Sequence, residues 1–149
     1  MQPDAKIGVL LKSKGHQVFS VGPRDTVYHA IATMAQNGIG ALLVMESDRL
    51  LGILSERDYM RKVILQGRSS KEARVEEIMT SSVITTTPEQ SVEDAMRMMT
   101  EHRIRHLPVV EGTRVVGVLS IGDLVKWIIS AHEATINHLK HYISGGYMS

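Results

Sequence analysis

The chain has 149 residues, of which 43% are hydrophobic and 22% charged, a composition typical of a globular protein with a real core. Its 17 basic and 16 acidic side chains leave a formal charge of +1, which provides no general attraction to nucleic acid or to a membrane. The absence of cysteine excludes disulfides and thiolate chemistry, and no apolar run approaches the ~20 residues that span a bilayer. We therefore expect a cytoplasmic protein.

The first half of the chain predicts the order strand, helix, hairpin, helix. The predicted elements are a strand at 18–21, a helix opened by Asp25 and Thr26, strands at 41–45 and 50–54, and a helix from Glu56 to about Gln66. Ser47 and Asp48 mark the tight turn between the two hairpin strands. The polar segment 67–74 is interpreted as a linker.

The second half predicts the same order. Its elements are a strand at 83–86, a helix opened by Ser91, strands at 107–110 and 115–119, and a long helix from Ile121 to about Ser144. The helix after Ser91 carries Val92, Ala95, Met96 and Met99 at the spacing i, i+3, i+4, i+7, which indicates one buried face.

The two halves are copies of one unit. Residues 52–58 read Gly-Ile-Leu-Ser-Glu-Arg-Asp, and 117–123 read Gly-Val-Leu-Ser-Ile-Gly-Asp, 65 positions later. The same register without a gap reaches back to Val18 and Val83, which indicates a duplication. A unit of about 60 residues is marginal alone. We therefore predict an α+β fold of two pseudo-symmetric β-α-β-β-α repeats, at 6–66 and 75–144, packed through their sheets.

The ordered motifs resemble the CBS domain. In the second copy the resemblance is carried by Glu-Ile-Met-Thr at 77–80, by Pro88, by Ile-Arg-His-Leu-Pro-Val-Val at 104–110 and by residues 117–124; the first copy matches less fully. The resemblance implies a stand-alone tandem pair, or Bateman module, that binds AMP, ADP, ATP or an NAD-type ligand in clefts between its repeats. It also implies a homodimer that regulates an unidentified effector protein without catalysis, catalytic cofactor or metal.

The resemblance further implies which residues bind the nucleotide. Asp58 and Asp123 would accept the ribose hydroxyls, because an ionised carboxylate only accepts hydrogen bonds, and the amides of their helix N-termini would favour a phosphate. Arg105 and His106 would add positive charge at the Asp123 cleft, whereas Arg57 is the candidate donor at the Asp58 cleft. The remaining expected contacts are Ser55, Ser120, Ile53, Val118, Val18, Val83, Ile39, Gly40, Ala41 and Thr80.

Other interpretations of these residues stay open. Asp58 and Asp123 can be simple helix-capping acids, and Arg105 with His106 can be an exposed strand pair. The apolar face of the last helix can wrap the module or pack against a second subunit, and the subunit contact is favoured; the face comprises Leu124, Trp127, Ile128, Ala131, Thr135, His138, Leu139 and Tyr142. The whole chain can be a dimerisation scaffold with degenerate clefts. A nucleic-acid binder that uses Arg97, Arg103, Arg105 and Arg114 is disfavoured by the near-zero net charge.

Overall fold

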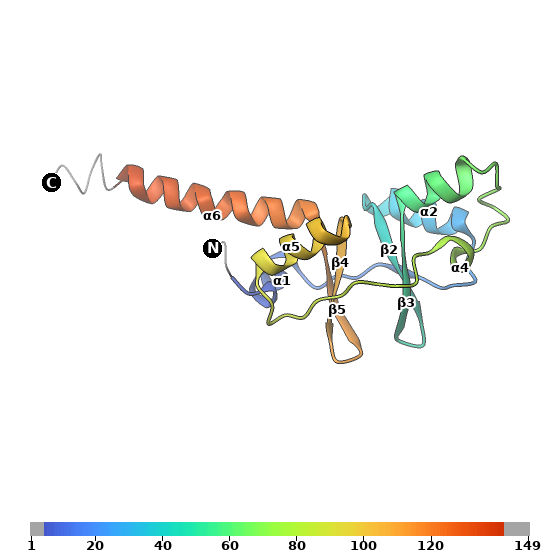
Figure 1. The fold of residues 1–149 in the computed structure, drawn as a ribbon, viewed down its shortest axis with the longest axis horizontal. Coiled ribbons are helices and arrows are strands. Elements are labelled where there is room, and N and C mark those ends of the chain that lie inside the picture. The colour runs from blue at the N-terminus through green and yellow to red at the C-terminus, as the bar shows by residue number, and fades with distance from the viewer. Residues whose placement is uncertain (1–4, 142–149) are drawn as a thin grey trace. The chain divides into compact units, whose positions relative to one another are not determined.

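The computed structural model describes residues 5–141, which form two compact α+β units built from separate stretches of the chain. The first-repeat unit holds Gln17–Ile84 and the hairpin tip Gly112–Val115. The second-repeat unit holds the described residues up to His16, Thr85–Glu111 and the described residues from Val116 onward. Helix α1 (Ile7–Lys14) therefore packs with the second repeat although it precedes the first in the chain (Figure 1).

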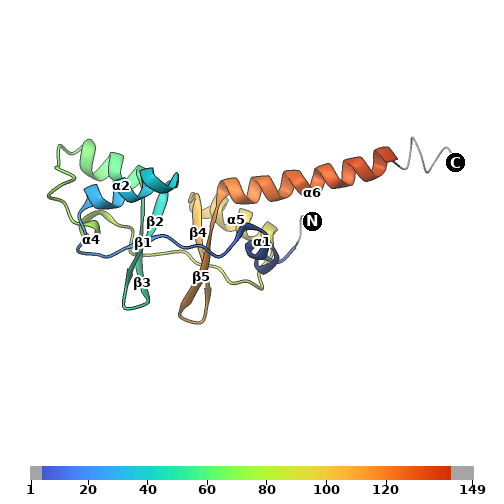
Figure 2. The same cartoon turned by 180° about the vertical axis from the view of Figure 1, so that it is seen from behind.

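The sheet of the first-repeat unit has the strand order β1 (Ser20–Val21), β2 (Ala41–Glu46) and β3 (Arg49–Ser55). Strand β1 runs parallel to β2, and β2 pairs antiparallel with β3. Figure 2 labels all three strands of this sheet. Ser47 and Asp48 have φ angles of 50° and 63°, so both central residues of the hairpin turn adopt the left-handed conformation that suits the strand twist. The predicted turn is therefore confirmed.

Four helical segments complete this unit: α2 (Val27–Asn37), α3 (Glu56–Tyr59), the π-helical turn η1 (Met60–Ile64) and α4 (Val75–Ile78). Helix α2 begins at Thr26, whose hydroxyl accepts a hydrogen bond from the amide of His29 at 3.1 Å. It ends at Gly38, whose φ of 62° lies in the left-handed region that terminates helices. The predicted helix after Glu56 is present as α3 followed by η1.

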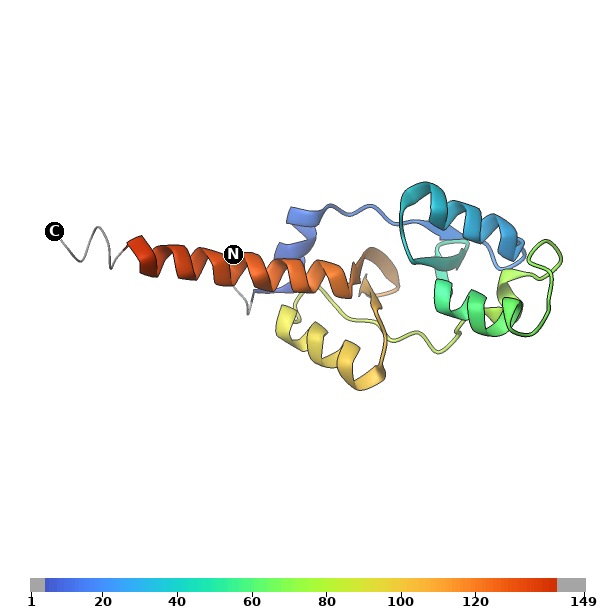
Figure 3. The same ribbon diagram turned by 90° about the horizontal axis from the view of Figure 1, so that it is seen from above.

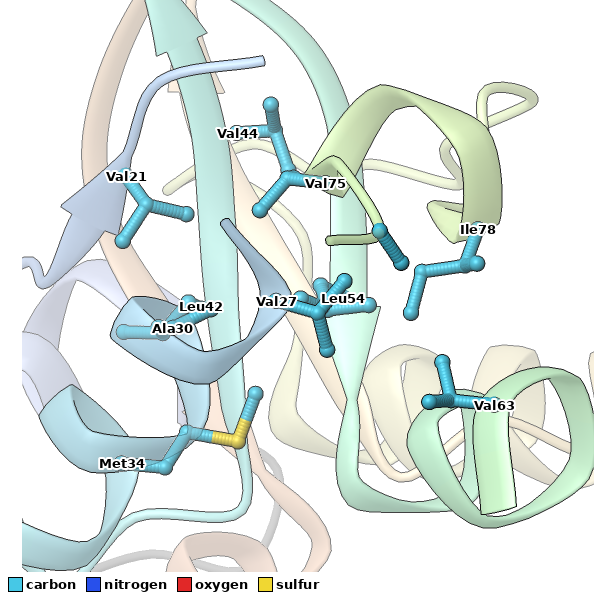
Figure 4. Close-up of a cluster of buried hydrophobic side chains, with 11 residues drawn as sticks. Val21, Val27, Ala30, Met34, Leu42, Val44, Leu54, Val63, Val75 and Ile78 are labelled. Atoms are coloured by element: carbon cyan, nitrogen blue, oxygen red, sulfur yellow. The ribbon is translucent and has the colours of Figure 1, made fainter. Parts of the chain in front are cut away.

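The core of the first-repeat unit gathers side chains from its strands and helices, as Figure 4 shows. The buried residues are Val21, Val27, Ala30, Met34, Leu42, Val44, Leu54, Val63, Ala73, Val75 and Ile78. Ala73 belongs to the predicted linker, and its carbonyl accepts from the amide of Val27 at 2.9 Å. The carbonyl of Ser70 accepts from the amide of Tyr28 at 2.8 Å. The segment 67–74 thus satisfies the first amides of α2 and is part of the packed unit.

The second-repeat unit contains α1, α5 (Val92–His102), β4 (His106–Glu111), β5 (Arg114–Ser120) and α6 (Ile121–His141). Helix α5 and strands β4 and β5 begin and end 65 positions after α2, β2 and β3. The structure therefore confirms the duplicated register. The predicted residues 142–144 of the last helix lie outside the described residues.

The predicted strand at 83–86 is wrong in extent, because only Thr86 pairs, in a single parallel bridge with Val109. In the first copy, the amide of Leu43 donates to the carbonyl of Phe19 at 3.2 Å and extends the ladder. The residue equivalent to Leu43 is Pro108, which has no N–H group. The second copy cannot make this hydrogen bond, and its first strand is reduced to one residue.

Helices α1 and α6 pack on the second-repeat unit. The amides of Ile7 and Gly8 donate to the carbonyls of Gln90 at 2.8 Å and Pro88 at 3.0 Å. Helix α6 lies beside α5 and then extends past it (Figures 1 and 3). Its buried residues include Leu124, Trp127 and Ala131, and Ile128 is half-buried. The face predicted as a subunit contact is therefore already covered at these positions within the chain itself. The side chains of Thr135, His138 and Leu139 and the whole of Tyr142 lie outside the described part of the chain. Within residues 5–141, no helix combines the length and apolarity needed to cross a membrane.

Candidate functional site

The two Ser-x-x-Asp motifs close the first turn of the helix that follows each hairpin. The amide of Ser55 donates to Oδ2 of Asp58 at 3.0 Å, and the amide of Asp58 donates to the Ser55 hydroxyl at 3.2 Å. The same reciprocal bonds join Ser120 and Asp123, at 2.8 Å and 3.1 Å. Both pairs are capping boxes, so the interpretation of these two acids as helix caps is correct for their local hydrogen bonds.

A third pair, Ser91 and Asp94, makes the same two bonds at 3.1 Å and 2.9 Å at the start of α5. The capping geometry by itself is therefore not specific to a ligand site. The surroundings differ: 37% of the Asp94 side chain is exposed, against 15% for Asp58 and 25% for Asp123. The two repeated acids are thus more enclosed than an ordinary capping acid of the same chain.

The loop before each hairpin is attached to the same helix N-terminus. The carbonyl of Gly40 accepts from the amide of Glu56 at 3.0 Å, and that of Arg105 accepts from the amide of Ile121 at 2.8 Å. Ala41 also pairs with Ser55 in the sheet. The structure therefore brings Gly40 and Ala41 beside the Ser55–Asp58 turn, and Arg105 beside the Ser120–Asp123 turn. Of the other predicted residues, Ile39 packs against the hydrophobic core and His106 is the first residue of β4. The structure also corrects one expectation, because the first and third amides of each helix are already bonded within the protein.

Around Asp58, the closest cation is Lys62, whose Nζ lies 3.4 Å from Oδ1. Lys62 also donates to the carbonyl of Ile78 at 2.9 Å, so its ammonium is held in place. Arg57, the predicted cation at this site, is half-buried but forms no ion pair within the described residues. The spacing i, i+4 between Asp58 and Lys62 is a known helix ion-pair signal that the sequence analysis missed.

Strand β3 is closed on its outer edge beside this site. Ile53 and Thr80 exchange both backbone hydrogen bonds, at 3.0 Å and 2.9 Å. The amide of Ile53, one of the expected nucleotide contacts, is therefore already used by Thr80. Val18 and Val83 are half-buried, and no hydrogen bond or ion pair in the described part of the chain ties them to the Asp58 turn.

Around Asp123, the cation comes from a distant part of the sequence. Lys14, at the end of α1, places Nζ 2.5 Å from Oδ2 of Asp123 and also donates to the carbonyl of Val118. Burial raises the pKa of the Asp123 carboxyl, but hydrogen bonds from Lys14 and the Ser120 amide outweigh it, so the pKa lies below its ordinary value. Asp123 is therefore an anion paired with Lys14 across 109 positions of sequence, a contact that no spacing rule predicts.

The Lys14–Asp123 pair lines a cavity of about 250 Å³ between α1 and α6. The polar side chains of this cavity are Ser13, Lys14, Asp123, Lys126 and Ser130, and its apolar part is Leu10 and Trp127. All of these residues belong to the second-repeat unit. The cavity joins one carboxylate to two ammonium groups, which suits a ligand that carries both hydrogen-bond donors and negative charge.

Comparison with known proteins shows the CBS-domain family. The CBS domain matches residues 14–65 and again residues 75–130. The mitochondrial CBS domain-containing protein CBSX3 of Arabidopsis thaliana is 48% identical over 128 residues, which are 83% of this chain and 62% of that protein. This chain thus matches less than two thirds of the length of CBSX3.

Solved structures show the same similarity. A CBS-domain protein from Burkholderia ambifaria MC40-6 has a TM-score of 0.82 at 51% identity, covering 85% of this chain and 95% of that one. The CBS domain pair of protein MJ0100, in complex with 5′-methylthioadenosine and S-adenosyl-L-methionine, has a TM-score of 0.76 at 23% identity. That match covers 86% of this chain and 98% of the other.

Proposed function

Because this chain belongs to the CBS-domain family and carries two copies of that domain, we propose that it is a regulatory sensor of adenine nucleotides. The observation that carries the proposal is the Asp123 carboxylate, which lines a cavity together with two ammonium groups. A ribose diol offers donors to the carboxylate, and a phosphate offers acceptors to the lysines. The candidate ligands are AMP, ADP, ATP and NAD.

The ligand class rests on these residues. The MJ0100 domain pair is bound to adenosyl compounds, but at 23% identity its similarity supports only the fold. In the proposed mechanism the nucleotide favours one arrangement of the chain by its differential affinity, and a homodimer transmits this change to an effector protein. The chain itself catalyses no reaction. We keep the cytoplasm as the proposed location; the CBSX3 relative is named as mitochondrial.

Calorimetric titration of the full chain with AMP, ADP, ATP, NAD and S-adenosylmethionine tests this proposal. The titrations are repeated on Asp58→Ala and Asp123→Ala, with Asp94→Ala as the matched control, because Asp94 has the same capping box away from the cavity. We expect one ligand class to bind the wild type, to lose affinity in Asp123→Ala and to keep it in Asp94→Ala. If none of these ligands binds to the folded protein, the proposal is refuted.

A dimerisation scaffold is the second candidate, and one surface favours it. On α6, the side chains of Val125, Ile129 and Ile136 are 41%, 50% and 49% exposed, and their spacing of i, i+4, i+11 places them along one side of the helix. Light scattering of the wild type and of Ile129→Glu measures whether this stripe holds two chains together. A dimer that forms through the stripe and binds none of the nucleotides would support the scaffold over the sensor.

A further inference from the structure

We propose that Lys14 determines which adenosyl ligands the Asp123 site accepts, so that the site selects ligands with a phosphate over neutral ligands and over ligands with a net positive charge. This inference rests on the proposed nucleotide-binding function and adds the ligand class to it. Its basis is the position of the Lys14 ammonium, which donates to two acceptors of this site, the carboxylate of Asp123 and the carbonyl of Val118.

One oxygen of the Asp123 carboxylate, Oδ2, already accepts its full number of hydrogen bonds. Its Oδ2 accepts from the Ser120 amide at 2.8 Å and from Lys14 at 2.5 Å. A carboxylate oxygen offers about two lone-pair positions, so a third donor cannot be added to Oδ2. A ribose diol that uses both carboxylate oxygens must therefore displace the Lys14 ammonium. A ligand that uses Oδ1 alone leaves Lys14 in place but loses one hydroxyl contact.

The charges around the cavity determine whether that displacement is favourable. Among the described residues that line the cavity, Lys14 and Lys126 share it with one carboxylate, that of Asp123. When neutral hydroxyls replace the ammonium at Asp123, Lys14 loses its ion pair while a second ammonium stays nearby. A phosphate on the ligand gives Lys14 a new partner, because its long flexible side chain can follow the anion. Adenosine provides no such partner. In S-adenosylmethionine the sulfonium and the ammonium outweigh the single carboxylate, so that ligand brings a net positive charge to the two lysines.

The first repeat provides an internal comparison. At Asp58, Oδ2 accepts from the amide and the hydroxyl of Ser55, while Lys62 stands 3.4 Å from the other oxygen, Oδ1. Lys62 is also anchored on the carbonyl of Ile78. The ammonium there contacts Oδ1 and not the oxygen used by the capping box, and the edge of β3 at Ile53 is closed by the backbone of Thr80. The selection by displacement is therefore specific to the second repeat.

The test compares AMP with adenosine, which differ by the phosphate, and adds S-adenosylmethionine as the cationic ligand. All titrations use the full chain with Asp58→Ala, so that only the Asp123 site is measured. In this background we expect AMP to bind at least about tenfold more tightly than adenosine. Lys14→Met keeps the length of the side chain and removes its charge. It should reduce this ratio to about threefold or less, by weakening AMP and strengthening adenosine. The matched control is Lys12→Met, an exposed lysine on the same helix, which should leave the ratio unchanged.

The outcomes separate this inference from the proposed function. An AMP-to-adenosine ratio that is the same with and without Lys14 would overturn the inference while the sensor function stands. A wild-type site that prefers adenosine or S-adenosylmethionine to AMP would also overturn the inference alone. Failure of the unmodified wild type to bind any adenosyl ligand would overturn both. Circular dichroism of each variant confirms that the comparison is made on folded protein.

Discussion

Two equivalent glycines predict a measurable difference between the repeats. Gly52 in β3 and Gly117 in β5 lie at the same position of the two copies. A Cβ atom at Gly52 would lie 2.8 Å from both the Thr80 carbonyl oxygen and the Met79 sulfur. A Cβ atom at Gly117 would lie 2.8 Å from Cδ2 of Leu11. Both substitutions by alanine create a clash, but the first clash involves backbone and the second only a side-chain methyl.

The magnitudes follow from what can move. Thr80 is held to Ile53 by two backbone hydrogen bonds, so Gly52→Ala must stretch that pairing. Overpacking costs about 1–3 kcal/mol and a weakened hydrogen bond about 1 kcal/mol more, which predicts a loss of roughly 3 kcal/mol for Gly52→Ala. Leu11 is buried but can change rotamer, so Gly117→Ala should cost about 1–2 kcal/mol. The intrinsic stability gained when a strand glycine is replaced by alanine is the same at both positions, so it cancels when the two variants are compared.

The assay is urea unfolding followed by far-UV circular dichroism and by the fluorescence of Trp127, the single tryptophan. Trp127 is 6% exposed in the second-repeat unit and reports on that unit. Gly122→Ala is the control, because its nearest new contact is an ordinary 3.6 Å from the Ser120 hydroxyl. Equal losses at Gly52 and Gly117, or no loss at Gly52, would refute the reasoning.

Single side chains elsewhere carry three more predictions. Asp123→Asn should lower the stability of the protein at neutral pH but not in acid. The pKa of Asp123 is lowered in the folded state, so its contribution to stability is present above the unfolded pKa of about 4 and disappears as pH falls through the folded pKa. The midpoints of urea unfolding at several pH values measure this difference. Leu124→Ala, at a fully buried position, should cost about 2–5 kcal/mol in urea unfolding, whereas Ile129→Ala should change stability by less than about 0.5 kcal/mol. Arg103→Gly should stabilise by about 1 kcal/mol in thermal unfolding, because Arg103 ends α5 in the left-handed conformation that Gly38 adopts after α2; a fall in Tm would contradict this.

Much of the fold is predictable because its signals are local. Hydrophobic period, capping residues and turn residues act over a few positions, and they place α2, β2 and β3 and their copies 65 positions later. The first strand of the second copy is shorter than predicted for an equally local reason, because Pro108 has no amide N–H group. Helix α1 is absent from the predicted elements although Ile7, Leu10 and Leu11 have helical spacing. Its place on the second repeat depends on long-range packing that no local pattern encodes.

The candidate site divides in the same way. Asp58 and Asp123 can be predicted because the duplication repeats them after the same hairpin. Lys62 is four positions from its partner and was available to sequence reasoning. Lys14 was not, because its partner Asp123 is 109 positions away and the contact exists only once α1 packs beside α6. The cation that most affects the proposed ligand is therefore the one that only the structure reveals.

The assignment of α1 to the second repeat has a consequence for synthesis. The first-repeat unit, apart from its hairpin tip, is complete once residue 84 has left the ribosome, and folding of such a unit can begin then. Helix α1 is translated before that unit, yet its packing partners at Pro88 and Gln90 and around Asp123 are translated after it. We expect Ile7, Leu10 and Leu11 to stay exposed to chaperones until the last third of the chain emerges. Helix α1 is thus synthesised before the first-repeat unit but buried after it.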